Sequence, residues 1–309
     1  MLNLILDLDT GIDDSIALTI AAKDKDINLL GVTCTYGNVT VDESAYNTLS
    51  ILNLLDRRDV PVYKGRDRSL TSTLPYTPHE AGRKIHGKSG SGNIVLRESE
   101  RKIETIDAIE FLSSIMKERD DITIITTGPM TNLASVIILN PSLSSWKGKV
   151  IFMGGALCVR GNVNHFAEAN IYKDPEAAKI VLESDLDITM IGLDVTERVR
   201  LYRKDAEKWK NKGSKIGNTL GAMLDYYLDN TLSLDETYVH DPSAVIAAIH
   251  PEYFSIMSFP LTVETEGIDR GRVIIDNNRL ISDMNNVKVA LNVNRNKLED
   301  FLSRFDEYL

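Results

Sequence analysis

Short runs of β-branched and other apolar residues alternate along the chain with segments whose apolar residues recur at helical spacing. Apolar runs bounded by Gly, Thr or Asp predict strands at 3–7, 28–35, 122–126, 149–153 and 187–193. Segments with the helical period predict helices at 14–22, 43–55, 106–117, 131–138, 175–183, 215–228, 242–249 and 297–305. This alternation predicts an α/β fold with an open, mostly parallel central β-sheet flanked by helices.

The domain organisation follows from the absence of sharp boundaries and internal repeats in the sequence. We expect residues 1–309 to form a single domain, because a chain of this length can bury one large core. The stretch 82–92 carries Gly-Lys-Ser-Gly-Ser-Gly and has the composition of a lid or mobile loop.

Composition narrows the class of protein. The hydrophobic fraction of 43% and charged fraction of 26% are ordinary for a globular chain, and no apolar run approaches the ~18 residues of a membrane span. The first nine residues lack a basic region before an apolar stretch, so we expect a cytoplasmic protein. The net charge is −10 and the basic residues are scattered, which argues against a nucleic-acid partner. The two cysteines lack metal-ligand spacing, so neither a zinc site nor a disulfide framework is indicated.

Candidate chemistry begins directly after the first predicted strand. Asp7, Asp9, Asp13 and Asp14 place four carboxylates within eight residues. In an open parallel sheet the ligand crevice lies at the carboxyl ends of the strands, where this cluster would stand. Crowded carboxylates either take raised pKa values or are neutralised by a cation, and a hard cation such as Ca²⁺ or Mg²⁺ prefers oxygen ligands. Alternatively, Asp13 and Asp14 merely occupy the favourable first turn of a helix.

Further polar clusters also stand beside apolar runs. They are Tyr36-Gly37-Asn38, the segment from Thr126 to Asn132, and His240-Asp241-Pro242, in which Pro242 can open a helix. Taken singly, each has an ordinary structural interpretation as a turn, a helix cap or a partly buried imidazole.

Taken together and in order, these segments resemble the nucleoside hydrolase family, called inosine–uridine preferring, nearly end to end. The family's Asp-x-Asp-[Pro/Thr]-Gly-x-Asp-Asp appears at Asp7 to Asp14, with Thr10 as a common variant of its Pro. Its other motifs appear at Gly37-Asn38, Thr127 to Asn132, Gly154-Gly155, Gly161-Asn162, Ala167 to Asn170 and His240 to Pro242. Counting the three segments from Gly154 to Asn170 as one motif, five ordered motifs make the resemblance specific, and it implies a Rossmann-like fold and hydrolysis of ribonucleosides to free base and ribose.

The resemblance also implies a metal centre. Asp9, both carboxylate oxygens of Asp14, the backbone carbonyl of Thr127, and Asp241 are the expected ligands of a Ca²⁺ ion, whose oxygen-only shell suits that cation. Asp9 is the expected general base, because the cation lowers the pKa of the attacking water.

The substrate contacts are carried over in the same way. The expected ribose contacts are Asp13 and Asn38 at the 2′ side, Asn170 and Asp241 at the 3′ side, and Asn162 and Glu168 at the 5′-hydroxyl. His240 is the candidate acid that protonates the departing base, because histidine titrates near neutral pH. His86 is a candidate for contacting the base, although an exposed loop histidine fits its sequence position equally well.

Base preference is less directly encoded. A purine-selective branch of the family stacks the base between tryptophans and lacks the histidine of His-Asp-Pro, whereas here Trp146 and Trp209 stand near no motif. We therefore expect the pyrimidine or broad-specificity branch, acting for example on uridine, cytidine or inosine. Tyr226, Tyr227 and Tyr238 are better explained by packing than by the base pocket. The family usually forms homodimers or homotetramers, and we expect the same here.

Two alternatives come from other classes of protein. The opening Asp7-Leu8-Asp9-Thr10-Gly11 also looks like that of haloacid dehalogenase-like phosphatases, with Asp7 as nucleophile and Mg²⁺ as metal. The late Gly-Asp that such a phosphatase needs is poorly supplied by Gly192-Leu193-Asp194. The other alternative is a catalytically silent nucleoside-binding protein, against which the joint presence of Asp9, Asp14, Asp241 and His240 argues.

Overall fold

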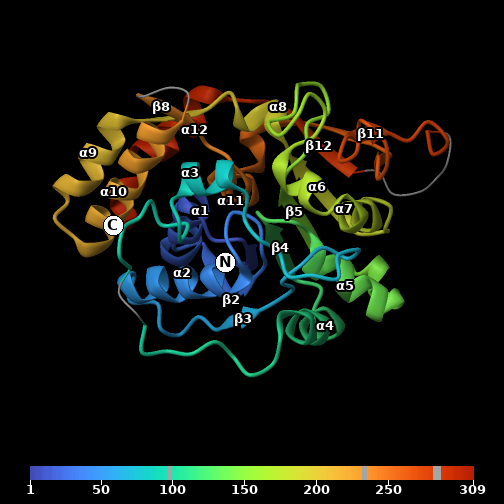
Figure 1. The fold of residues 1–309 in the computed structure, drawn as a ribbon, viewed down its shortest axis with the longest axis horizontal. Coiled ribbons are helices and arrows are strands. Elements are labelled where there is room, and N and C mark those ends of the chain that lie inside the picture. Colours follow the sequence, from blue (N-terminus) through green and yellow to red (C-terminus); the bar gives the residue numbers. More distant parts are fainter. Residues whose placement is uncertain (97–98, 232–234, 281–286) are drawn as a thin grey trace.

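The computed structural model describes residues 1–96, 99–231, 235–280 and 287–309 (Figure 1). At its centre lies an eight-stranded sheet of order β3-β2-β1-β4-β5-β6-β12-β9. The strands of this sheet are β1 Leu2–Leu8, β2 Ile27–Cys34, β3 Val62–Lys64, β4 Ile122–Thr126, β5 Lys149–Met153, β6 Asp187–Ile191, β9 Phe254–Phe259 and β12 Val287–Val293. Neighbouring strands run parallel except β9, which pairs antiparallel with β12. The predicted α/β fold with a mostly parallel sheet is confirmed.

Helices cover both faces of the sheet (Figure 1). The first face carries α1 Ile12–Lys23, α2 Val41–Leu54, α9 Arg203–Asn211, α10 Lys215–Asn230, α11 Asp241–Ile249 and α12 Arg295–Ser303. The second face carries α4 Ala108–Glu118, α5 Thr131–Leu139 and α7 Pro175–Leu182. The remaining short helices are α3 Glu80–His86, α6 Ala169–Lys173 and α8 Leu193–Thr196, with 3-10 turns at Pro141–Ser145, Pro251–Tyr253 and Phe305–Tyr308.

Two small antiparallel ribbons lie outside the main sheet. One pairs β7 Arg200–Tyr202 with β8 Glu236–Tyr238, and the other pairs β10 Leu261–Val263 with β11 Val273–Ile275. Among the described residues, none of the helices combines the length and apolar character that a membrane crossing requires.

The first strand shows how the sequence builds both layers. Successive side chains of a strand point to opposite faces of the sheet. Leu4, Leu6 and Leu8 accordingly join the core beneath α1, α2 and α11, whereas Ile5 joins the core beneath α4, α5 and α7. The side chain of Asp7 points to the same face of the sheet as that of Ile5, and its Oδ1 accepts a hydrogen bond of 2.7 Å from Asn132 of α5.

Every predicted strand and helix has a counterpart in the structure, with bounds that differ by at most two residues. The strand predicted at 187–193 ends at Ile191, because Gly192 is the N-cap of α8. The loop predicted at 82–92 is wrong in its first part, since residues up to His86 form α3. β3, β9 and β12 of the main sheet were not predicted.

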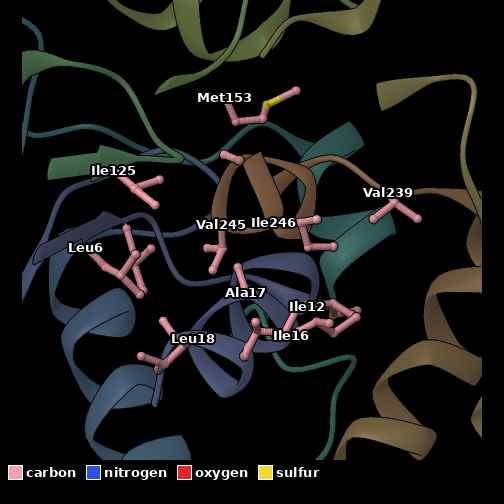
Figure 2. Close-up of a cluster of buried hydrophobic side chains, with 14 of the residues drawn as sticks. Leu6, Ile12, Ile16, Ala17, Leu18, Ile125, Met153, Val239, Val245 and Ile246 are labelled. Carbon is pink, nitrogen blue, oxygen red and sulfur yellow. The ribbon is translucent and has the colours of Figure 1, made fainter. Parts of the chain in front are cut away.

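The core beneath α1 and α11 is drawn in Figure 2, where Ala17 of α1 and Val245 of α11 lie close together and Leu6 points in from β1. All of these side chains are fully buried. Every residue of α1 from Ile12 to Ala22 is buried, so this helix is covered on all sides and holds the loop that precedes it in place.

We predict that Leu6→Ala lowers the free energy of unfolding by about 2–5 kcal/mol, because it removes a buried side chain and leaves a cavity. The matched control is Leu139→Ala on α5, where the side chain is 62% exposed and the same change should cost below about 0.5 kcal/mol. Urea denaturation of both variants measures the difference. Equal destabilisation would contradict the assignment of Leu6 to the core.

Candidate active site

The candidate site lies where the strand order reverses. From β1 the chain continues to β2 and β3 on one side, and β4, β5 and β6 follow on the other. Ligands bind at such a switch point, outside the carboxyl ends of the strands. β1 ends at Leu8 and β4 ends at Thr126, so Asp9 and Thr127 enter the crevice from neighbouring strands. The backbone N–H of Thr127 donates to the carbonyl of Asp7 at 2.9 Å and fixes the two loops together.

Three carboxylates converge at this point. Asp13 and Asp14 open α1, Asp241 opens α11, and one oxygen from each lies within 4.8 Å of the others. All three side chains are buried. Among the described residues, Asp13 Oδ1 is a buried oxygen without a hydrogen-bond partner. An unsatisfied buried carboxylate oxygen beside two other carboxylates is the donor set of a hard cation, so these residues fit a Ca²⁺ or Mg²⁺ ion.

Asp14 is held by donors from three different loops. Its Oδ1 accepts from the Thr127 hydroxyl at 2.7 Å. Its Oδ2 accepts from the Gly11 backbone N–H at 2.8 Å and from Asn38 Nδ2 at 3.2 Å. The carboxylate is therefore fixed in orientation by the ends of β1, β2 and β4.

Asp9 is fully buried, and its carboxylate is held by Asn38 and Lys173. Its Oδ2 accepts from the backbone N–H of Asn38 at 2.5 Å and from Lys173 Nζ at 3.3 Å. Gly37 allows this close approach, because a Cβ at that position would lie 2.0 Å from Asp9 Oδ2. The Asp9 carboxylate therefore lies against backbone on one side and an ammonium group on the other.

Burial raises the pKa values of these carboxyl groups. It raises the pKa of Asp9 to about 7, with the charge of Lys173 acting in the opposite direction. Burial and then the charge of Asp13 raise the pKa of Asp14 to about 6. Burial likewise raises the pKa values of Asp13 and Asp241, and in Asp241 the neighbouring carboxylates add to the shift. Full ionisation of the cluster is therefore unfavourable without a cation.

The two predicted histidines lie over the carboxylates. His86 ends α3, and its Nδ1 accepts a hydrogen bond of 3.3 Å from the backbone N–H of Ile12. Burial lowers the pKa of His86 to about 3, so its ring is neutral and carries its proton on Nε2. The ring is buried, with its centroid 5.4 Å from that of Tyr227 and the two planes tilted by 34°, so the alternative of an exposed loop histidine is wrong.

His240 precedes α11, and its Nδ1 lies 2.9 Å from the Thr196 hydroxyl. Burial lowers the pKa of His240, while the charge of Asp13 favours the protonated ring. The net effect lowers the pKa of His240, which opposes the simple expectation of a histidine that titrates at its ordinary value.

The remaining predicted residues stand on the α6 side. Asn170 Nδ2 donates to the Thr127 carbonyl at 2.6 Å and so joins the carboxylate cluster to α6. Glu168 caps α6, and its oxygens accept from the backbone N–H groups of Gly155, Asn170 and Ile171. Asn162 is exposed, and its Oδ1 accepts from the backbone N–H of Ala169. Among the described contacts, Asn162 is joined to the site only through this loop.

Sequence reasoning missed two polar residues of the site. Lys173 ends α6 and contacts Asp9, and Thr196 ends α8 and contacts His240. Tyr227 was assigned to packing; it is buried, yet it also lies against His86 and near the charges of Asp13 and Asp241. No sequence motif marks Lys173 or Thr196, because each is one polar residue in a short helix.

The structure also places the two tryptophans and Asp7. Trp146 and Trp209 are buried packing residues, Trp146 donating to the Arg119 carbonyl and Trp209 lying against Phe305. Asp7 is fully buried beneath the site and accepts from Thr33 and Asn132. A nucleophile in that position would have no access to substrate, so the phosphatase alternative finds no support here.

Comparison with known proteins decides the family. The family model described as "Inosine-uridine preferring nucleoside hydrolase" matches residues 4–300 of the chain. The chain belongs to this family. It is therefore an enzyme, a ribonucleoside hydrolase that acts on N-glycosyl bonds, and the resemblance found in the sequence is confirmed.

Similar members of the family differ in the base they are named for. Uridine nucleosidase 1 of Arabidopsis thaliana is 35% identical, over 88% of this chain and 81% of its own length. Pyrimidine-specific ribonucleoside hydrolase RihA of Klebsiella pneumoniae is 31% identical, over 98% of this chain and 97% of its own length. Among solved structures, a purine-preferring ribonucleoside hydrolase from Gardnerella vaginalis superposes with a TM-score of 0.95 at 36% identity, covering 99% of this chain and 98% of its own.

We predict that divalent-cation affinity rises steeply with pH between about 5 and 8. Folding raises the pKa values of Asp9 and Asp14 above the ordinary value of 3.8, to about 7 and about 6, so the metal-free protein holds protons that a cation must displace. Because the folded state raises these pKa values, protonated Asp9 and Asp14 stabilise the metal-free fold at low pH. That stability is lost as the pH rises through the raised pKa values. The increase in Tm on adding Ca²⁺ should therefore be larger at pH 8 than at pH 5.5.

The control for this prediction is Asp14→Asn, in which the Tm increase should be small at both pH values. An increase in Tm that is independent of pH in the unaltered protein would contradict the prediction.

Proposed function

We propose that this nucleoside hydrolase is Ca²⁺-dependent and that it cleaves the N-glycosidic bond of pyrimidine or, more broadly, inosine and uridine ribonucleosides. The observation that carries the proposal is the convergence of Asp13, Asp14 and Asp241 beside the buried Asp9, at the switch point of the sheet. Few arrangements other than a hard cation offset so much buried negative charge.

The proposed metal ligands are Asp9, Asp14, the Thr127 carbonyl and Asp241. Asp14 and Asp241 belong to the convergent group, and Thr127 adjoins it at the end of β4, where its hydroxyl donates to Asp14. When bound, the ion supplies positive charge that makes a water molecule more acidic near neutral pH. Asp13 shares the convergent group, and we propose that its unpartnered oxygen serves the ribose 2′ side.

The proposed general base is Asp9. Its carboxylate is fully buried, and the Asn38 N–H and Lys173 Nζ fix its Oδ2, so Oδ1 is the oxygen placed to take a proton from water. The proposed acid is His240, whose ring is oriented by Thr196; burial lowers its pKa, and the charge of Asp13 acts in the opposite direction. The general base and the general acid are then different residues.

The ribose contacts are proposed as the resemblance implies them. Asn38 reaches Asp9 and Asp14 through its side chain, which supports its place at the 2′ side. Asn170 and Asp241 would serve the 3′ side, with Asn162 and Glu168 at the 5′-hydroxyl. Because cleavage develops positive charge on the sugar, surrounding carboxylates stabilise the transition state more than the ground state.

We propose that His86 contacts the base. It is neutral and its Nδ1 already accepts from Ile12, so its Nε2–H is available as a donor to a carbonyl oxygen or ring nitrogen of the base. A homodimer or homotetramer and a cytoplasmic location stay predictions from the family and the sequence.

The deciding experiment incubates the purified protein with the common ribonucleosides, with Ca²⁺ or with chelator, and follows the free base by chromatography. Release of base that depends on Ca²⁺ is the expected result. Phosphate release from phosphomonoesters without any ribose from nucleosides would instead favour the phosphatase alternative. A tight nucleoside complex that never turns over would favour the silent binding protein.

We predict that 2′-deoxynucleosides are very poor substrates, because Asp13 and the metal are both assigned to the 2′-hydroxyl. Losing the hydroxyl leaves a buried carboxylate without its partner, which costs about 1–3 kcal/mol or more. Steady-state kinetics on uridine and deoxyuridine measure the effect, and comparable kcat/KM values for the two would remove Asp13 from the 2′ side.

We predict that His240→Ala slows natural nucleosides by about 10²–10⁴-fold but affects a nitrophenyl riboside much less. A good leaving group departs without a proton, whereas every substrate needs the activated water. Asp9→Ala is the matched variant and should slow both substrates. Equal loss on both substrates in His240→Ala would mean that His240 positions Asp241 or the pocket instead.

A further inference from the structure

The side chain of His240 is held from outside its own helix. His240 is the N-cap residue of α11, yet its side chain makes no capping hydrogen bond. The first turn of α11 is closed by backbone, since the N–H of Ser243 donates to the His240 carbonyl at 3.1 Å. The imidazole is therefore left to other partners, and its Nδ1 lies 2.9 Å from the hydroxyl oxygen of Thr196 on α8.

The position of Thr196 is fixed independently of α11. Helix α8 follows the end of β6 after a single residue, and Thr196 is fully buried. The carboxylate of Asp194, in the same helix, accepts from the backbone N–H groups of Leu157 and Cys158 at 3.0 and 2.8 Å. The Thr196 hydroxyl is therefore placed by the end of β6 and by the loop that follows β5.

The hydrogen-bond partners of Thr196 indicate which group donates in its contact with His240. A hydroxyl can either donate to a ring nitrogen or accept from it. Among the contacts of the described residues, the partner of the Thr196 hydroxyl is His240 Nδ1. If Nδ1 of the neutral ring carried the proton, the buried hydroxyl proton would have no acceptor among these contacts, which is costly. The hydroxyl therefore donates to Nδ1, and the proton of the neutral ring lies on Nε2.

The other buried histidine of the site is held in the same sense. Nδ1 of His86 accepts from the backbone N–H of Ile12, a group that can only donate. Asp13 Oδ1 lies 3.9 Å from this Nδ1, and the charge of Asp13 also acts on the His240 ring. Both rings therefore adjoin the carboxylate cluster, and each has its Nδ1 engaged by the protein and its Nε2–H left for a ligand.

We propose that Thr196 is a positioning residue that fixes His240 in the Nε2–H tautomer, so that the departing base meets an N–H donor. The proposal rests on the proposed function, because it takes His240 as the group beside the leaving base. The hydrogen bond made by one ring nitrogen of a histidine sets which nitrogen carries the proton. Without the hydroxyl, Nδ1 becomes a buried acceptor without a partner, and the ring loses the contact that fixes its orientation.

The first test removes the hydroxyl and keeps the shape of the side chain. Thr196→Val should lower kcat for a natural ribonucleoside by about 10- to 100-fold, with little change for a nitrophenyl riboside, whose leaving group needs no donor. Thr196→Ser keeps the hydroxyl and should restore most of the activity. The matched control is Thr19→Val in α1, another fully buried threonine, whose hydroxyl donates to the Ser15 carbonyl at 2.8 Å. It should leave kcat for both substrates unchanged.

Two further measurements isolate an effect that passes through His240. In a His240→Ala background, adding Thr196→Val should cause no further loss on a natural ribonucleoside, because the ring through which Thr196 acts is already absent. The second measurement is NMR of protein with ¹⁵N-labelled histidine, in the presence of Ca²⁺ and near neutral pH. The His240 signals, identified by their loss in His240→Ala, should show a protonated Nε2 and an unprotonated Nδ1. Thr196→Val should shift the Nδ1 resonance, and Thr196→Ser should return it.

The results that would overturn this role of Thr196 are distinct from those that would overturn the function. A proton on Nδ1 of the neutral His240 ring would overturn it, as would equal losses on both substrates in Thr196→Val or a failure of Thr196→Ser to restore activity. If no ribonucleoside is hydrolysed, the proposed function fails. The NMR measurement needs no turnover, so it still decides whether Thr196 sets the tautomer of His240.

Discussion

Mutual repulsion among buried carboxylates is the constraint on which the rest of this structure depends. Asp9, Asp13, Asp14 and Asp241 are all buried, and one oxygen from each of Asp13, Asp14 and Asp241 lies within 4.8 Å of the others. In a low-dielectric environment such a cluster cannot ionise without compensation, and its pKa values rise as a result. A cation relieves the repulsion only if the carboxylates are already held at its coordination distance, so the scaffold must hold them together while they repel.

The fold meets this requirement with parts that are rigid for other reasons. Asp13 and Asp14 lie in the first turn of α1, and Asp241 lies in the first turn of α11, where the helix dipole favours negative charge. These two helices pack against each other over a fully buried core (Figure 2). Donors from the ends of β1, β2 and β4 then fix the orientation of Asp14. Packing far from the chemistry therefore sets the geometry of the carboxylate oxygens.

Local patterns in the sequence were sufficient for the elements that carry the carboxylates. β1 is a short apolar run that ends beside acidic residues, and α1 begins a few residues later, so the position of Asp9 at the strand end could be predicted. β3 has only three residues and gives too little pattern to recognise. β12 does alternate, but it joins the sheet between β6 and β9 out of chain order, which local periodicity does not encode.

The site residues divide in the same way. Residues within motifs at strand ends were found, whereas Lys173 and Thr196 were not, because their relevance depends on where α6 and α8 dock. From the sequence alone, Lys173 would be taken for a surface residue. Only the tertiary structure places its ammonium group against Asp9. His86 was a candidate from sequence, but its burial and its neutral tautomer required the packing of α3 over α1.

One fold serves relatives that are named for different bases. The proposed metal contacts come from Asp9 and Thr127 at strand ends and from carboxylates in the first turns of α1 and α11, two helices that pack against each other over the buried core. The proposed base side is built from His86 of α3, Tyr227 of α10 and His240 before α11, elements joined to the sheet by side-chain packing. Similar enzymes named for uridine and for purines share this fold. On the proposed assignments, a change in base preference would involve the packing around α3 and α10, while the carboxylate cluster proposed to hold the metal stays as it is.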